Sequence, residues 1–143
     1  MATLTLETRS EEETSAAGER LVADVRPGDV ILLYGDLGAG KTAFVRGMAR
    51  ALGVPSAEVS SPTFTLIQEY PASPATLYHV DLYRLKPEEV DDLGLDELMA
   101  TGIVAVEWPD RWVDRPAAAR EVRIEHRGGD TRHIVVLNTR EPS

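Results

Sequence analysis

The sequence predicts one α/β domain of three layers, in which helices cover both faces of a mixed, mainly parallel sheet with antiparallel hairpins at the edge. Two observations predict the sheet: the runs Val30–Tyr34 and Ile103–Val106 are apolar throughout, as is typical of strands buried on both faces. A third observation is that stretches with a helical pattern are mixed with these strands along the chain. A length of 143 residues, with 43% hydrophobic and 27% charged residues, favours a single globular domain over residues 1–143.

The N-terminal third of the chain predicts a strand, a helix, a strand and a second helix. The first strand is expected at Leu4–Glu7. Ser10 and Glu13 have the spacing of a capping box, which predicts a helix that runs to about Val25. After the apolar strand and a glycine-rich loop, the pattern over Lys41–Leu52 predicts the second helix.

The rest of the chain predicts two hairpins around a helix and the second apolar strand. Phe64–Tyr70 and Thr76–Tyr83 are expected to form the first hairpin. Pro87 suits the first turn of a helix that runs to about Met99, with an interruption at Gly94. The second hairpin, expected at the sheet edge, joins strands over residues 122–126 and 133–137 through a turn containing two glycines.

The glycine-rich loop carries the most specific motif in the chain. It is Gly35-Asp36-Leu37-Gly38-Ala39-Gly40-Lys41-Thr42, which matches G-x-x-x-x-G-K-[ST], the P-loop. Its glycines let backbone N–H groups approach phosphate oxygens, and the helix that follows adds its positive end. Lys41 supplies an ammonium to the β- and γ-phosphates, and the Thr42 hydroxyl suits Mg²⁺. The expected fold is therefore P-loop NTPase-like, and residues 35–42 are the expected nucleotide-binding loop.

A P-loop site needs a further carboxylate near the metal, and two strand ends offer one. Glu107 ends the apolar run Ile103–Val106, so it is the predicted metal ligand together with Thr42. Asp81 ends a more polar, aromatic strand and is expected either to position water for catalysis or to support the metal site without binding the metal directly. Thr63, in the loop between the second helix and the first hairpin, is a candidate γ-phosphate sensor, the alternative being an ordinary turn.

Aromatic and histidine side chains near these positions carry weaker predictions. Trp108 follows Glu107 and is expected either to cover the site or to pack. The three histidines, His79, His126 and His133, lack metal-ligand spacing and are expected to be structural or surface residues.

Composition excludes several other classes of function. The formal net charge is −9, so the chain is not expected to grip a nucleic-acid backbone itself. Cysteine is absent, which excludes disulfides, thiolate metal sites and a cysteine nucleophile. No apolar run approaches a membrane span and no signal peptide is expected, so the predicted location is the cytoplasm. The acid-rich residues 81–100 and the arginine-rich residues 111–140 are expected to be solvated faces or docking surfaces.

Four segments together carry a family resemblance. They are residues 33–42, 61–66 (Ser-Pro-Thr-Phe-Thr-Leu), 79–84 (His-Val-Asp-Leu-Tyr-Arg) and 106–109 (Val-Glu-Trp-Pro). In order and spacing the chain resembles the TsaE family, the bacterial ATPases of tRNA threonylcarbamoyladenosine biosynthesis. The resemblance runs from about Ser10 to Trp108.

The resemblance implies an ATP- and Mg²⁺-dependent ATPase that joins a transferase assembly of TsaD and TsaB. That assembly modifies adenosine 37 of tRNAs that read codons beginning with A, and contact with tRNA goes mainly through these partners. The ATPase is not itself the transferase, and hydrolysis resets the assembly.

The resemblance also implies roles for single residues. It places Glu107 at the metal ligand, and Thr63 and Asp81 in two switch-like motifs. Thr14 and Arg132 fall where the family contacts the nucleotide.

Two alternatives remain open from the residues alone. A small-molecule kinase would need an arginine-bearing lid, for which Arg111 and Arg115 are candidates. A nucleotide-gated scaffold would bind ATP and release it slowly. A GTPase is disfavoured because guanine selection uses N-K-x-D, and the one asparagine is Asn138. No arginine near the loop stands out as an internal finger, so slow turnover is expected without partners.

Overall fold

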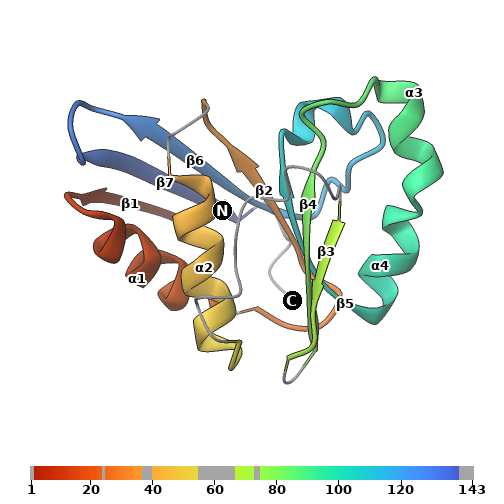
Figure 1. The fold of residues 1–143 in the computed structure, drawn as a ribbon, viewed down its shortest axis with the longest axis horizontal. Helices are drawn as coiled ribbons and strands as arrows, with labels where there is room; N and C mark the ends of the chain where they lie inside the picture. The colour runs from red at the N-terminus through yellow and green to blue at the C-terminus, as the bar shows by residue number, and fades with distance from the viewer. Residues whose placement is uncertain (1, 24, 37–39, 55–66, 73–74, 139–143) are drawn as a thin grey trace.

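The computed structural model describes residues 2–23, 25–36, 40–54, 67–72 and 75–138, which form a seven-stranded sheet with helices on both faces (Figure 1). The strands are β1 Ala2–Thr8, β2 Val30–Tyr34, β3 Ile67–Tyr70, β4 Thr76–Asp81, β5 Gly102–Glu107, β6 Arg120–His126 and β7 Arg132–Asn138. The helices are α1 Glu11–Val22, α2 Lys41–Ala51, α3 Pro87–Val90 and α4 Leu95–Thr101, with 3₁₀ turns η2 Asp91–Leu93 and η3 Pro109–Arg111. Among the described residues, no helix has both the length and the apolar character that a membrane crossing needs.

The sheet is parallel at its centre and antiparallel towards both edges, in the order β1-β7-β6-β2-β5-β4-β3. β6, β2, β5 and β4 pair in parallel, whereas β3 pairs antiparallel with β4, and β7 antiparallel with β6 and β1. The predicted mixed α/β fold is confirmed. The second hairpin is not the outermost part of its edge, because β1 pairs with β7 outside it.

Strand β4 has a more central place than its polar sequence indicated. It belongs to the predicted hairpin with β3, and it also pairs in parallel with β5, where Asp81 lies opposite Glu107. Both acids therefore lie at the carboxyl ends of neighbouring parallel strands, which is where α/β sheets place their ligands.

Two hydrophobic cores lie on opposite faces of the sheet. Ile31 and Leu33 of β2 face the core closed by α1 and α2, whereas Val30 and Leu32 face the core closed by α3 and α4. All four side chains are at most 3% exposed. Burial on both faces is the physical reason that this run lacks polar residues, as its sequence predicted.

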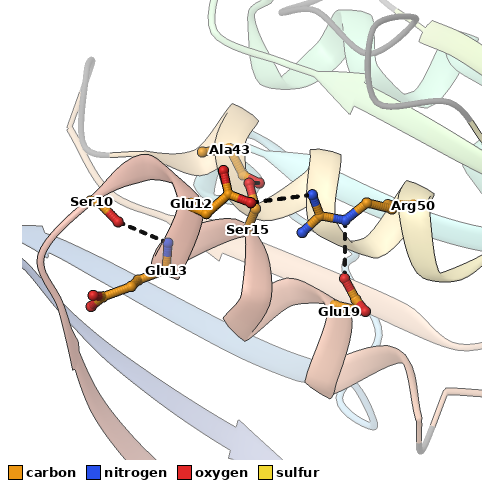
Figure 2. A network of polar contacts seen from close by, with 7 residues as sticks. All are labelled: Ser10, Glu12, Glu13, Ser15, Glu19, Ala43 and Arg50. Carbon is orange, nitrogen blue, oxygen red and sulfur yellow. Dashed lines mark hydrogen bonds and ion pairs between the residues drawn. The ribbon is translucent and has the colours of Figure 1, made fainter.

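Helices α1 and α2 pack against each other very closely. An added Cβ at Gly47 of α2 would lie 1.7 Å from the Ser15 carbonyl oxygen of α1, so only glycine fits there. The Ser15 hydroxyl donates to the Ala43 carbonyl at 2.9 Å, and Arg50 pairs with Glu19 at 3.0 Å (Figure 2). These contacts fix α1 along the length of α2, from Ala43 in its first turn to Arg50 in its last.

Two helix ends differ from their predicted positions. Ser10 caps α1 as predicted, its hydroxyl accepting from the Glu13 N–H at 3.1 Å, but the helix ends at Val22 rather than near Val25. The predicted interruption at Gly94 is confirmed, since that residue has φ 70° and separates α3 and η2 from α4. The last helix then continues to Thr101, two residues beyond the predicted end.

Candidate nucleotide site

A cavity of about 370 Å³ opens where β4 and β5 end and α2 begins. Eight of the residues singled out from the sequence line it: Thr14, Gly40, Lys41, Thr42, Asp81, Glu107, Trp108 and Arg132. They come from α1, α2, the ends of β4 and β5, and β7. The size is that of a small-ligand site.

Gly40 shapes the start of α2. It has φ 106° and ψ 14°, in the left-handed region that disfavours residues with a Cβ, and its carbonyl accepts the Phe44 N–H at 3.0 Å. An added Cβ would also lie 3.5 Å from the Thr14 methyl group and 3.7 Å from Arg132 Nε. The N-terminus of α2, from Gly40 to Ala43, lines the cavity and turns its positive dipole end towards it.

Lys41 is the first residue of α2, and its side chain is only 4% exposed. Its ammonium donates to the Gly35 carbonyl at 2.6 Å and lies 4.0 Å from the ring centroid of Trp108. Burial lowers the pKa of Lys41 below its usual value, and the negative charges of Glu107 and Asp81 oppose that shift. The ammonium is thus a desolvated cation on the wall of the cavity.

Asp81 lies opposite Glu107 in the parallel ladder. Burial raises the pKa of Asp81, and the charge of Glu107 adds to the rise. The Tyr83 N–H, which donates to Asp81 at 2.9 Å, and the charge of Lys41 act in the opposite direction on that pKa. A carboxylate with its proton affinity raised in this way is suited to orient or accept a proton from water.

Glu107 is 4% exposed and receives a hydrogen bond from a histidine that the sequence reasoning had set aside. Nε2 of His79 lies 2.5 Å from Glu107 Oε2, and the His79 side chain is fully buried. The prediction of a structural or surface role for His79 did not include this contact with the carboxylate at the cavity wall.

Trp108 both packs and covers, so the two predicted roles are combined. Among the described residues it is the one non-glycine with positive φ, at 59°, a backbone conformation that costs about 1–2 kcal/mol. Its ring lies 4.8 Å from the Tyr83 ring and forms part of the cavity wall over Lys41.

Thr14 and Arg132 lie close to Gly40. Thr14 is 1% exposed, and its hydroxyl is 2.8 Å from the hydroxyl of Thr8 at the end of β1. Arg132 donates to the carbonyls of Gly129 and Thr131 at 2.9 and 3.1 Å in the β6–β7 turn. Both side chains line the cavity beside α2.

Four further polar residues line the cavity without having been predicted: Ser10, Glu11, Arg46 and Asp130. Arg46 follows Thr42 by one helical turn, so the i, i+4 spacing in the predicted helix was the available signal. It also brings an arginine into the cavity from the P-loop helix, which the sequence reasoning had not singled out. Tertiary packing alone brings Ser10, Glu11 and Asp130 to the cavity, so no local sequence pattern predicted that they would line it.

The other predicted site residues are not among the described residues that line this cavity. Gly35 contributes through its carbonyl oxygen, which accepts from Lys41, and Asp36 is exposed. Leu37, Gly38, Ala39 and Thr63 lie outside the described residues.

The oxygen donors present suit a magnesium ion. Thr42 offers a hydroxyl and Glu107 a carboxylate, both hard ligands on the cavity wall. The described residues contain no cluster of three or more histidine, cysteine or acidic side chains placed to hold a metal. In proteins Mg²⁺ commonly takes one or two carboxylate or hydroxyl oxygens and completes its shell with water and substrate phosphates.

The parallel sheet centre, the glycine turn into α2 and the lysine at its start define a P-loop-type α/β protein. The crystal structure of YdiB from Bacillus subtilis superposes with a TM-score of 0.80, at 36% sequence identity, over 96% of this chain and 86% of that one.

The chain belongs to the TsaE family: the family model described as "Threonylcarbamoyl adenosine biosynthesis protein TsaE" matches residues 8–134. A tRNA threonylcarbamoyladenosine biosynthesis protein TsaE from Bacillus subtilis is 43% identical over 136 residues, which are 94% of this chain and 85% of that protein. The protein of the same name from Aquifex aeolicus is 47% identical over 109 residues, 75% of this chain and 76% of its own length.

Proposed function

We propose that this protein binds and hydrolyses Mg-ATP in support of the assembly that forms threonylcarbamoyladenosine at position 37 of tRNAs reading A-starting codons. It is not the transferase itself. The observation that carries the proposal is the convergence of Lys41, Thr42, Asp81 and Glu107 on one cavity at the start of the P-loop helix. The whole chain acts as one ATPase domain.

In this proposal the phosphates lie against the N-terminus of α2. The first N–H groups of α2 bind the phosphate oxygens, and Gly40 keeps the approach open. The Lys41 ammonium leaves the Gly35 carbonyl to neutralise the β- and γ-phosphates. Thr14 and Arg132, which lie close to Gly40, hold the remainder of the nucleotide.

Hydrolysis proceeds by attack of water on the γ-phosphorus, with the bond to the β–γ bridging oxygen breaking and ADP leaving. Asp81 orients this water from the end of β4, while Thr63 senses the γ-phosphate. Thr42 and Glu107 hold Mg²⁺, which when bound offsets charge on the phosphate oxygens. The chain's own contribution is positioning and electrostatic stabilisation.

The partners in this proposal are TsaD and TsaB, which supply most of the contact with tRNA in the cytoplasm. The net charge of −9 supports that division, because an acidic chain is poorly suited to hold a nucleic-acid backbone. Turnover is slow in the isolated chain and rises when the partners bind.

Steady-state phosphate release from Mg-ATP tests the proposal, first with the chain alone and then with TsaD and TsaB added. We expect a low rate alone and a strong rise in the mixture. A complex that forms without any rise would instead indicate a nucleotide-sensing scaffold.

Glu107→Ala tests the metal-ligand assignment separately. We expect Mg²⁺-dependent turnover to fall far more than nucleotide binding measured in EDTA, because only the first needs the carboxylate. Equal losses in both assays would mean that Glu107 is a structural acid.

The kinase alternative is not favoured. The candidate lid arginines point elsewhere: Arg111 donates to the Leu85 carbonyl at 3.5 Å and Arg115 to the Trp112 carbonyl at 3.0 Å. Neither residue lines the cavity among the described residues.

A further inference from the structure

We propose that His79 is a positioning residue, which holds the Glu107 carboxylate in the orientation that binds the metal ion of Mg-ATP. The inference rests on the proposed function, and it concerns a side chain that touches neither nucleotide nor metal. Its role is to fix the Glu107 side chain, which binds the metal in the proposed function.

Strand geometry brings the two residues together. In the parallel ladder Asp81 lies opposite Glu107 and His79 opposite Ala105, so the three polar side chains project from one face of the sheet, towards α2. His79 lies one strand repeat behind Asp81, which puts its ring beneath the Glu107 side chain. Nε2 is 2.5 Å from Oε2.

The chemistry of the contact assigns the direction of the hydrogen bond. An ionised carboxylate has no hydrogen to donate, so Nε2 carries the proton and donates it. Nδ1 is buried and finds no hydrogen-bond partner among the described residues. The bond to Glu107 is therefore the polar contact that offsets the cost of placing an imidazole at a fully buried position.

A purely structural role accounts poorly for a histidine at this position. Its neighbour on the same strand face, two residues earlier, is Leu77, which is also fully buried and belongs to the core under α2. An apolar side chain at 79 would fill similar space without leaving a buried nitrogen unpaired. What an apolar residue lacks is the N–H that restrains Glu107.

Restraint of Glu107 matters because charges of both signs surround it. Its negative charge acts on both Lys41 and Asp81 and raises the pKa of each, against the effect of burial on Lys41 and together with it on Asp81. A Glu107 carboxylate released from His79 is free to turn towards the Lys41 ammonium, where it would compete with the phosphates. Hydrogen-bond partners of metal-binding side chains commonly change metal affinity by about 10–100-fold when removed.

Binding of a fluorescent ADP, with and without Mg²⁺, separates positioning from folding. For His79→Leu we expect the apparent Mg²⁺ affinity of the ADP complex to weaken about 10–100-fold, with affinity in EDTA within about twofold of wild type. His79→Gln keeps an amide N–H of similar reach and should retain most of the Mg²⁺ response. Leu77→Val is the matched control, a buried change on the same strand face that leaves Glu107 held.

Imidazole NMR of the nucleotide-free protein gives a second readout, independent of metal and activity. The chain has three histidines, so the spectrum holds three ring systems. We expect His79 to show a slowly exchanging Nε2–H and a tautomer protonated at Nε2. Glu107→Gln should shift that proton, while His126→Asn and His133→Asn identify the other two systems.

The outcomes distinguish this inference from the proposed function. A normal Mg²⁺ response in folded His79→Leu, or a His79 ring protonated only at Nδ1, overturns the positioning role. Should His79→Leu fail to fold, His79→Gln and the NMR spectrum still decide it. If wild type itself shows no Mg²⁺-dependent nucleotide binding, the proposed function fails first.

Discussion

The two ends of the cavity are built in different ways. The end where the phosphates are proposed to bind, here called the phosphate end, is formed by Lys41, Thr42, Asp81 and Glu107, which come from one continuous motif and two neighbouring strand ends. The hairpin end consists of Ser10, Glu11, Thr14, Asp130 and Arg132, which come from the start of α1 and from the β6–β7 hairpin. These last two elements meet only because the sheet brings β1 and β7 together.

The electrostatic environments of the two ends differ as well. Lys41 and Glu107 are each 4% exposed, and both Lys41 and Asp81 have pKa values displaced mainly by burial. At the hairpin end Glu11 and Asp130 are exposed, so water and salt screen their charges. Substitutions at the phosphate end should therefore affect turnover strongly, and those at the hairpin end should affect affinity modestly.

The largest effect is expected for Lys41→Ala, which removes the desolvated cation. We expect kcat/KM for ATP hydrolysis to fall by about 10²–10³-fold, the usual loss for a group that stabilises transition-state charge. Lys86→Ala is the matched control, since Lys86 is the one other lysine of the chain and is exposed. Hydrolysis near the wild-type rate in Lys41→Ala would refute the P-loop assignment.

The next effect is expected for Asp81→Asn, which should lower turnover by about 10²-fold because the amide orients water poorly. Asp91→Asn, which changes an exposed acid in η2, is the control. Phosphate-release kinetics at saturating ATP measure the difference, and a rate within twofold of wild type would remove Asp81 from the mechanism.

Asp81→Asn should also alter the pH dependence of stability. Because burial raises the pKa of Asp81, the native protein holds this proton more tightly than the unfolded chain does. The stability from this group is fully present below the unfolded pKa of about 3.9 and is lost as pH rises through the native pKa. Urea unfolding should find the variant more stable than wild type at neutral pH, with the difference closing under acid conditions.

The same contrast explains how much of the site could be predicted from the sequence. Lys41, Thr42 and Glu107 were predictable because a contiguous loop and an apolar strand end identify them locally. His79 was not, since only the pairing of β4 with β5 puts its ring under Glu107. The fold was predictable in its elements and its parallel centre, whereas the outermost place of β1 depends on pairing between the two ends of the chain.

A smaller effect is expected where α1 meets α2. Gly47→Ala would set a methyl group 1.7 Å from the Ser15 carbonyl oxygen, so α1 must shift. We expect the free energy of unfolding to fall by about 1–3 kcal/mol, as for overpacked cores. Nucleotide affinity should weaken with it, because Thr14 moves with α1. Ala16→Ser, on the exposed side of α1, should change neither quantity in urea unfolding or ADP titration.

The smallest effect is expected for Thr14→Val, which keeps the side-chain shape and removes the hydroxyl. A single neutral hydrogen bond contributes about 0.5–1.5 kcal/mol, so nucleotide affinity should weaken about 2–12-fold with turnover at saturation unchanged. Thr8→Val is a strict control, because it breaks the same 2.8 Å contact between the two threonines but leaves the Thr14 hydroxyl at the cavity. Both variants should lose stability, and only Thr14→Val should lose affinity. Equal losses of affinity would mean that the Thr14 hydroxyl acts by fixing α1 and does not contact the nucleotide. Thr14 would then be a positioning residue at the hairpin end, as His79 is proposed to be at the phosphate end.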